Sequence, residues 1–327
     1  MKVLISSDLE GVSGVDDYRQ IFPVYPDLYE KARLLLTEDL NAAINGLRSA
    51  GATEIDVIDG HGGGVPPYVN IVKDKIESGV RVLAGFVVGV VGIYPSLNPV
   101  PLDSYDAHVI IGYHSMAGTL HGFLPHTASM ITAVRINGMY VGETEMSAYG
   151  AGVHNLPTIL VTGDAAVVRE AKSLLPGIEG VIVKKALSRK KAECLPLDEA
   201  RSLIQKAAFD CLSNLEKFKP FRPSLPIHLD VIFGAPELAR LAATLPRSKL
   251  TDEHTLSYDA ENYSEAMDAF WTALSLAIGG QQLGLTKKLV EVEEAKKVME
   301  EWLKTRARRW VNDPPPFPPI GELKNAR

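Results

Sequence analysis

Short apolar strands alternate with amphipathic helices along the first part of the chain, and this alternation limits the fold more than any other feature. Strand patterns lie at Lys2–Leu9, Glu54–Asp59 and His108–Tyr113. Between the first two, apolar residues recur at three- and four-residue steps over Leu28–Ser49, which is typical of a helix. Such β-α-β alternation favours a parallel sheet covered on both faces. We therefore expect an α/β fold, a three-layer sandwich around a mostly parallel sheet.

The later part of the chain changes character. Asn137-Gly138 separates two apolar runs within 130–141, a strong signal for an antiparallel hairpin. A proline-rich segment at 217–226 is typical of a linker, and strand patterns at 227–233 and 250–258 with a helix at 264–278 indicate a smaller α+β unit. We divide the chain into an α/β domain at 1–215, a smaller unit at 227–280 that completes the fold or makes oligomer contacts, and a helical, Pro-rich extension at 281–327.

Composition excludes several classes of protein. The formal charge of −6 disfavours nucleic acid as a partner, and the apolar run at 82–94 is too short to cross a membrane. Two cysteines and no apolar leader after Met1 favour a cytoplasmic location. The basic runs at 184–191 and 304–309 have no interleaved aromatic residues, so we expect solvated faces or oligomer contacts there. An enzyme or a binding protein remains.

Carboxylates and imidazoles follow the strands where each one ends. Asp8 and Glu10 lie at the end of the first strand, Asp59 and His61 at the end of the second, and His114 follows the strand at 108–113. Each alone is more often a cap, a loop acid or a structural histidine. Since ligands gather at the carboxyl ends of parallel strands, their convergence favours a joint site. This mixture of oxygen and nitrogen donors suits zinc or a similar divalent ion.

Further side chains could join such a site. Glu143 follows the hairpin, where it is either another metal ligand or a first-turn helix acid favoured by the helix dipole. His121 and His126 lie in the loop TLHGFLPHT, and either could act as a general base beside a metal-bound water. The spacing does not choose between these two histidines.

The motifs in this order resemble the DppA-type D-aminopeptidases. The resemblance covers about residues 1–280 and is carried by SDLEGVSG at the start, DGH at 59–61, GYHS at 112–115, PHTAS around His126, NGMYVGE up to Glu143, LVTGD at 160–164 and LSRKKAECLP at 187–196. Several unrelated motifs at matching separations make the resemblance specific. It does not extend to the 281–327 extension, and the apolar segment 84–93 departs from the more polar family pattern.

The resemblance implies a zinc peptidase that releases the N-terminal D-residue from short peptides, with two Zn²⁺ per subunit. It implies these metal ligands: Asp8 as the bridge, Glu10 and His61 on one ion, and His114 and Glu143 on the other. His126, rather than His121, matches the family's catalytic base or nucleophile. The attack would come from a two-metal-activated water or with assistance from the histidine. A ring-like homo-oligomer, a decamer in the family, is also implied.

Two further carboxylates could support the site, and two other functions would use the same residues. Asp59 and Asp164, both at strand ends, are candidates to orient a ligand imidazole. A two-metal hydrolase of another amide or ester would use the same residues, as would a non-catalytic protein that binds metal or peptide. His126 argues against the binding protein, because binding alone needs no proton-transfer group beside the metals.

Overall fold

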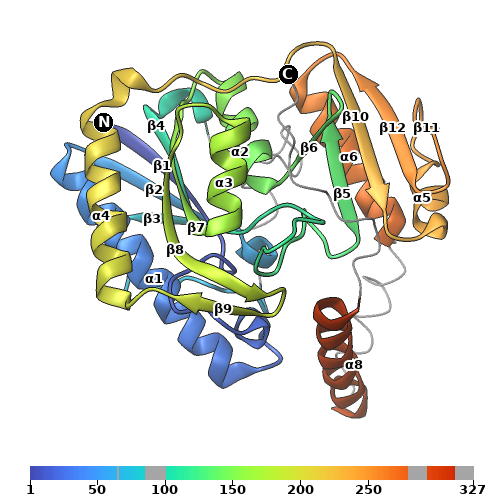
Figure 1. The fold of residues 1–327 in the computed structure, drawn as a ribbon, viewed down its shortest axis with the longest axis horizontal. Helices are drawn as coiled ribbons and strands as arrows, with labels where there is room; N and C mark the ends of the chain where they lie inside the picture. The colour runs from blue at the N-terminus through green and yellow to red at the C-terminus, as the bar shows by residue number, and fades with distance from the viewer. Residues whose placement is uncertain (65, 85–100, 279–292, 314–327) are drawn as a thin grey trace.

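The computed structural model describes residues 1–64, 66–84, 101–278 and 293–313, in which two β-sheets carry the fold (Figure 1). The larger is a seven-stranded sheet with the order β3-β2-β1-β4-β7-β8-β9. Its strands are β1 (Lys2–Ser7), β2 (Glu54–Asp59), β3 (Arg81–Ala84), β4 (Ala107–Tyr113), β7 (Thr158–Asp164), β8 (Glu179–Ser188) and β9 (Lys191–Cys194). All neighbours pair in parallel except β8 and β9, which confirms the predicted mostly parallel sheet.

Helices cover both faces of this sheet. On one face α1 (Pro26–Ser49) packs against α4 (Leu197–Ser213), and on the other lie α2 (Glu143–Val153) and α3 (Ala165–Leu174). Both faces of the sheet are apolar and need cover, as the buried residues of β4 show. Val109 and Ile111 join the core under α1 and α4, whereas Ile110 joins the core under α2 and α3. These layers confirm the predicted three-layer α/β architecture.

The second sheet is five-stranded and antiparallel, with the order β11-β12-β10-β5-β6. Its strands are β5 (Thr132–Ile136), β6 (Met139–Val141), β10 (Ile227–Phe233), β11 (Lys249–Leu250) and β12 (Thr255–Ala260), and α5 (Pro236–Ala242) and α6 (Tyr263–Ile278) pack against it. The predicted hairpin is confirmed as β5–β6, with positive φ of 52° at Asn137 and 81° at Gly138, as a tight primed turn requires.

Two sequence expectations differ from these strands. The segment predicted as one strand at 250–258 is divided, because the Asp252 carboxylate accepts hydrogen bonds from the backbone of His254 and Thr255 and closes a turn. The β5–β6 hairpin pairs with β10, so the second sheet draws strands from both sides of 217–226. The sheets therefore do not follow the proposed boundaries at 215 and 227, and the division into domains stays a prediction.

The C-terminal extension contributes one described helix, α8 (Glu293–Asn312), within the segment 281–327 that was predicted to be helical and Pro-rich. Its last turns place Ala307, Trp310 and Val311 in buried positions on one face. Residues 85–93 of the apolar segment and the prolines after Asp313 lie outside the described residues. Within the described ranges, no helix is long and apolar enough to cross a membrane.

Candidate active site

The loop after β1 is held against the end of β4 by backbone hydrogen bonds. The Asp8 amide donates to the Ile111 carbonyl at 2.9 Å, and the Gly11 amide donates to the Gly112 carbonyl at 2.7 Å. Gly112 has φ +77°, and a Cβ there would lie 2.4 Å from the Asp8 carbonyl oxygen. Only glycine permits this close approach, which fixes the position of Asp8 and its neighbours.

His61 faces two of the carboxylates that follow β1. Its Nδ1 lies 3.2 Å from Asp8 Oδ1 and 3.0 Å from Glu10 Oε2, while its Nε2 lies 2.9 Å from the Ile21 carbonyl oxygen. A carbonyl can only accept a hydrogen bond, so Nε2 carries a hydrogen and donates it. In the neutral ring, the lone pair of Nδ1 therefore points toward two carboxylates, an arrangement that calls for a cation.

His114 repeats this arrangement on the other side of Asp8. Its Nδ1 donates to the Ser115 carbonyl at 3.0 Å, and its Nε2 lies 3.5 Å from Asp8 Oδ2 and 3.3 Å from Glu143 Oε1. This Nε2 is buried and has no hydrogen-bond partner among the described residues. Glu143 reaches the site as the first residue of α2, and its Oε1 also accepts from the Ala128 amide at 2.7 Å.

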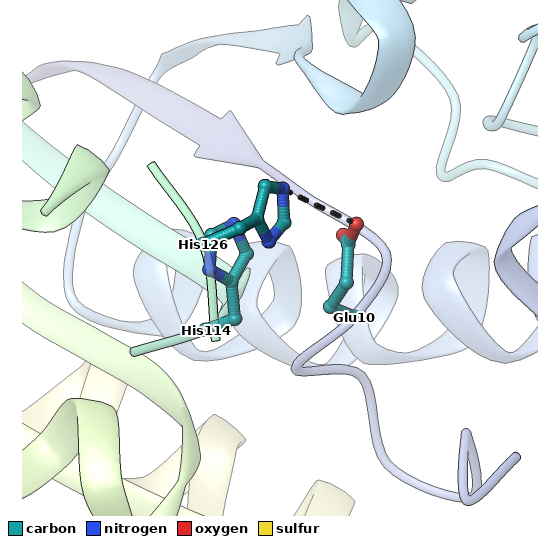
Figure 2. A group of neighbouring side chains, drawn as sticks. All are labelled: Glu10, His114 and His126. Atoms are coloured by element: carbon teal, nitrogen blue, oxygen red, sulfur yellow. Dashed lines mark ion pairs between the residues drawn. The ribbon is translucent and has the colours of Figure 1, made fainter. Parts of the chain in front are cut away.

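His126 lies beside His114 and points toward the Glu10 carboxylate (Figure 2). The two rings stack, with centroids 3.8 Å apart and an interplanar angle of 12°. Nδ1 donates to the Leu124 carbonyl at 2.9 Å, and Nε2 lies 3.9 Å from both Glu10 Oε1 and Glu143 Oε1. His121, the other histidine of this loop, is exposed, so the structure places only His126 at the site.

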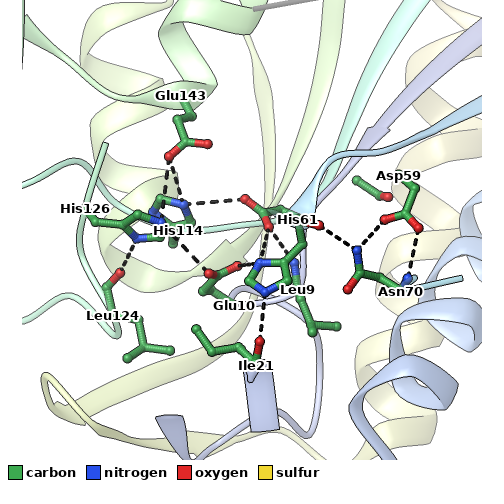
Figure 3. A network of polar contacts seen from close by, with 12 residues as sticks. Leu9, Glu10, Ile21, Asp59, His61, Asn70, His114, Leu124, His126 and Glu143 are labelled. Carbon is green, nitrogen blue, oxygen red and sulfur yellow. Dashed lines mark hydrogen bonds and ion pairs between the residues drawn. The ribbon is translucent and has the colours of Figure 1, made fainter. Parts of the chain in front are cut away.

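Together these residues form one network (Figure 3). Its nitrogen and oxygen atoms form three overlapping groups, each within 4.8 Å: Asp8, Glu10 and His61; Asp8, His114 and Glu143; and Glu10, His114 and His126. The structure thus brings together all of the residues predicted as ligands and base. Asp8 is shared by the two groups that match the two implied zinc sites. Carboxylate oxygens and imidazole nitrogens in this arrangement fit zinc.

The electrostatics of the site reflect the convergence of buried acids and imidazoles. Burial raises the pKa of Asp8, but contacts with His114 and His61 outweigh it and hold that pKa well below its usual value. Burial lowers the pKa of both histidines, yet the charges of Glu10 beside His61 and of Glu143 beside His114 raise them well above the ordinary value. The protein therefore draws positive charge into this cluster.

Comparison with known proteins assigns the family. A sequence model of the D-aminopeptidase family matches residues 1–272. The chain belongs to the D-aminopeptidase family. A D-aminopeptidase of Bacillus subtilis (strain 168) is 31% identical over 283 residues, which cover 85% of this chain and 98% of that protein.

Among solved structures, the chain is similar to the Zn-dependent D-aminopeptidase DppA from Bacillus subtilis, a self-compartmentalizing protease, with a TM-score of 0.78 and 28% identity. The match covers 85% of this chain and 98% of that chain. Family membership confirms the resemblance read from the motifs, and it favours an aminopeptidase over a metal- or peptide-binding protein.

The two carboxylates expected to orient imidazoles have other contacts in this family member. Asp59 accepts from Asn70 through the backbone amide at 2.9 Å and the side-chain amide at 2.6 Å, and Asn70 also donates to the His61 carbonyl. Asp164 accepts from the amides of Phe123 and Val167 at 2.7 Å and 2.9 Å, and so caps α3. Both stabilise backbone around the site, whereas backbone carbonyls orient the three rings.

Two contributors to the site were missed from the sequence. Lys184, in a basic run expected to be solvated, is buried and donates from Nζ to the carbonyls of Glu10 and Val15 at 2.5 Å and 2.6 Å. Burial lowers its pKa to about 8. The sequence carries a signal for this, because Lys184 directly follows the apolar run Val181–Val183, which is typical of a buried strand. Trp310 of α8 packs against His126, and no spacing in the sequence indicates that contact.

Proposed function

We propose that this chain is a zinc-dependent aminopeptidase that hydrolyses the N-terminal D-residue from short peptides. Two Zn²⁺ would be held by Asp8 as the shared ligand, by Glu10 and His61 on one side, and by His114 and Glu143 on the other. One observation carries the proposal: backbone carbonyls orient His61 and His114 so that the second nitrogen of each ring faces buried carboxylates. The zinc dependence of the Bacillus subtilis relative supports the choice of metal.

The chemistry that zinc supplies in such a centre is a water of lowered pKa and a polarised scissile carbonyl. The protein's own contribution is orientation and proton transfer. His126 is fixed through Nδ1 by the Leu124 carbonyl, so Nε2 is its free atom, and that atom faces Glu10 and Glu143. We assign to Nε2 the proton transfer between the attacking water and the departing amine.

A closed homo-oligomer is part of the proposal. The Bacillus subtilis relative is a self-compartmentalizing protease, which requires several copies around an enclosed space. We propose that this chain assembles in the same manner, as a ring of the decameric kind that the family resemblance implies. Restriction of substrates to short peptides would follow from that enclosure. Sedimentation or light scattering of the purified full chain gives the subunit number.

Hydrolysis of matched D- and L-substrates tests the function. The wild-type protein is assayed on D- and L-aminoacyl p-nitroanilides, on dipeptides and on an ester series, each before and after treatment with a zinc chelator. We expect release of D-residues that the chelator abolishes and added zinc restores. Turnover of L-residues alone, or of esters without peptides, would instead indicate a different two-metal hydrolase on this scaffold.

A further inference from the structure

The helix α8 lies beyond the family match, which ends at residue 272, yet one of its side chains reaches the candidate active site. The indole of Trp310 packs edge-on against the His126 ring, with centroids 5.3 Å apart and an interplanar angle of 83°. Trp310 is only 9% exposed. The extension thus places a large aromatic surface next to the residue assigned to proton transfer.

Several contacts hold this indole in place. Phe22 packs edge-on against it with centroids 6.1 Å apart, and the Arg189 guanidinium carbon lies 5.7 Å from the ring centroid. Two positions farther along α8, Asn312 accepts a hydrogen bond from Lys190. Aromatic and cation–π contacts of this kind fix the ring in a defined orientation. Trp310 is therefore part of the packed core around the site and not a loose surface residue.

A cavity of about 250 Å³ lies between Trp310 and the predicted zinc ligands. Glu10, His61 and His126 line its polar side. The rest of its lining is mostly apolar and aromatic, from residues that include Ile21, Phe22, Tyr68, Met130 and Trp310. This volume is smaller than the roughly 300–1,000 Å³ of sites for drug-sized ligands, and its apolar walls suit one bulky apolar side chain.

We propose that Trp310 is a specificity-determining residue: α8 brings it to the active site, where it forms the apolar wall that selects a bulky apolar side chain on the N-terminal residue of the substrate. The inference rests on the proposed function for the reaction that the site catalyses, whereas the cavity and its lining are observed independently of that function. A chain without this helix would leave the same side of the cavity open. The extension would thereby narrow the substrate range of the catalytic core.

Substrate ratios in the full-length protein test this role. The kcat/KM ratio for D-phenylalanyl over D-alanyl p-nitroanilide is measured for the wild type, Trp310→Ala and Trp310→Phe. We expect Trp310→Ala to lower the ratio about tenfold, mainly through KM, whereas Trp310→Phe keeps most of it. A change in His126 orientation would alter both substrates equally and leave the ratio unchanged. Arg308→Ala, an exposed change on the same helix, is the control and should behave as wild type.

A binding measurement separates this proposal from the proposed function. Calorimetry with D-phenylalanine and D-alanine needs no turnover, and tryptophan fluorescence should respond to D-phenylalanine in the wild type but much less in Trp310→Phe. If the wild type fails to hydrolyse D-substrates, the proposed function fails, while the binding preference still tests Trp310. A Phe-to-Ala ratio that Trp310→Ala leaves within about twofold of wild type, in turnover and in binding, would overturn the proposal.

A second variant covers the case in which Trp310→Ala does not fold. Met130 lies on the cavity lining in a different part of the chain and is half-buried, so its truncation disturbs the core less. Met130→Ala should lower the same ratio in the same direction. A series of D-alanyl dipeptides that differ in their second residue is assayed with the same variants. If the variants change the preference for that second residue and leave the D-phenylalanyl to D-alanyl ratio unchanged, the assignment of the cavity to the N-terminal side chain is wrong.

Discussion

At the scale of single residues, the three histidines of the site share one arrangement. Each directs one ring nitrogen to a backbone carbonyl, those of Ile21, Ser115 and Leu124, and presents the other to carboxylates. Backbone carbonyls thus set the tautomer of each ring, a role predicted from the sequence for the carboxylates of Asp59 and Asp164. Every residue has a backbone carbonyl, so the groups that orient these rings leave no signal in the sequence.

His126 and His121 provide a matched pair for testing the proton-transfer role. His126→Ala should keep its zinc, because it removes none of the assigned ligands, while kcat falls about 10²- to 10⁴-fold. His121→Ala, an exposed change in the same loop, should keep wild-type turnover. Zinc content and kcat of both variants are measured together. Full activity of His126→Ala with its zinc intact would show that the assigned role is wrong.

Asp39 of α1 gives a pH dependence of stability that is separate from the zinc ligands. Its side chain is fully buried and accepts from the Ser13 amide at 2.8 Å and from the Ser13 hydroxyl. Burial raises its pKa from 3.8 to about 6. Between these values the folded state keeps a proton that the unfolded chain has lost, so this stabilisation is present at low pH and is lost as pH rises through 6.

Comparison with Asp39→Asn isolates this effect. From pH 5 to pH 7.5, the free energy of unfolding of the wild type should fall by about 1 kcal/mol relative to the variant, which cannot ionise at this position. Denaturant unfolding of both proteins at the two pH values measures the difference, and titration of the zinc ligands cancels in it. A difference that is flat or of opposite sign would contradict the raised pKa.

At the scale of elements, the sequence predicted the features that depend on local residue patterns, such as single strands and tight turns. Strand β2 begins and ends at the predicted residues, and the Asn137-Gly138 turn forms as expected. Predicted ligands meet because parallel strands end at one edge of the sheet. Pattern could not show that β5 pairs with β10 or that Trp310 reaches His126, since both contacts join segments far apart in the chain and depend on packing rather than periodicity.

The close approach between the loop after β1 and the end of β4 can be tested at Gly112. Gly112→Ala would place a Cβ 2.4 Å from the Asp8 carbonyl oxygen, so we expect loss of zinc as well as a lower melting temperature. Gly138→Ala is the matched control, because its φ is also positive at +81° but nothing lies within 4 Å of the added Cβ. The control should cost only the conformational strain of about 1–2 kcal/mol and keep its zinc. Equal zinc content in the two variants would contradict the role of this contact.

At the scale of the whole molecule, the parallel sheet, the second sheet and the extension have separate parts in the proposed function. The parallel sheet supplies Asp8, Glu10, His61 and His114 from strand ends, and α2, which lies between the sheets, supplies Glu143. The helix α8 adds the Trp310 wall from outside the family match. Part of the formal charge of −6 belongs to the carboxylates of the site, and two divalent ions would offset it.

Zinc content per chain tests the central claim most directly. Mass spectrometric metal analysis of the wild type, purified without chelators, should give about two zinc ions per chain. Asp8→Asn, which removes the shared ligand, should hold less than one, whereas Asp103→Asn, an exposed carboxylate away from the site, should match the wild type. No zinc in the wild type, or an unchanged content in Asp8→Asn, would contradict a dinuclear centre bridged by Asp8.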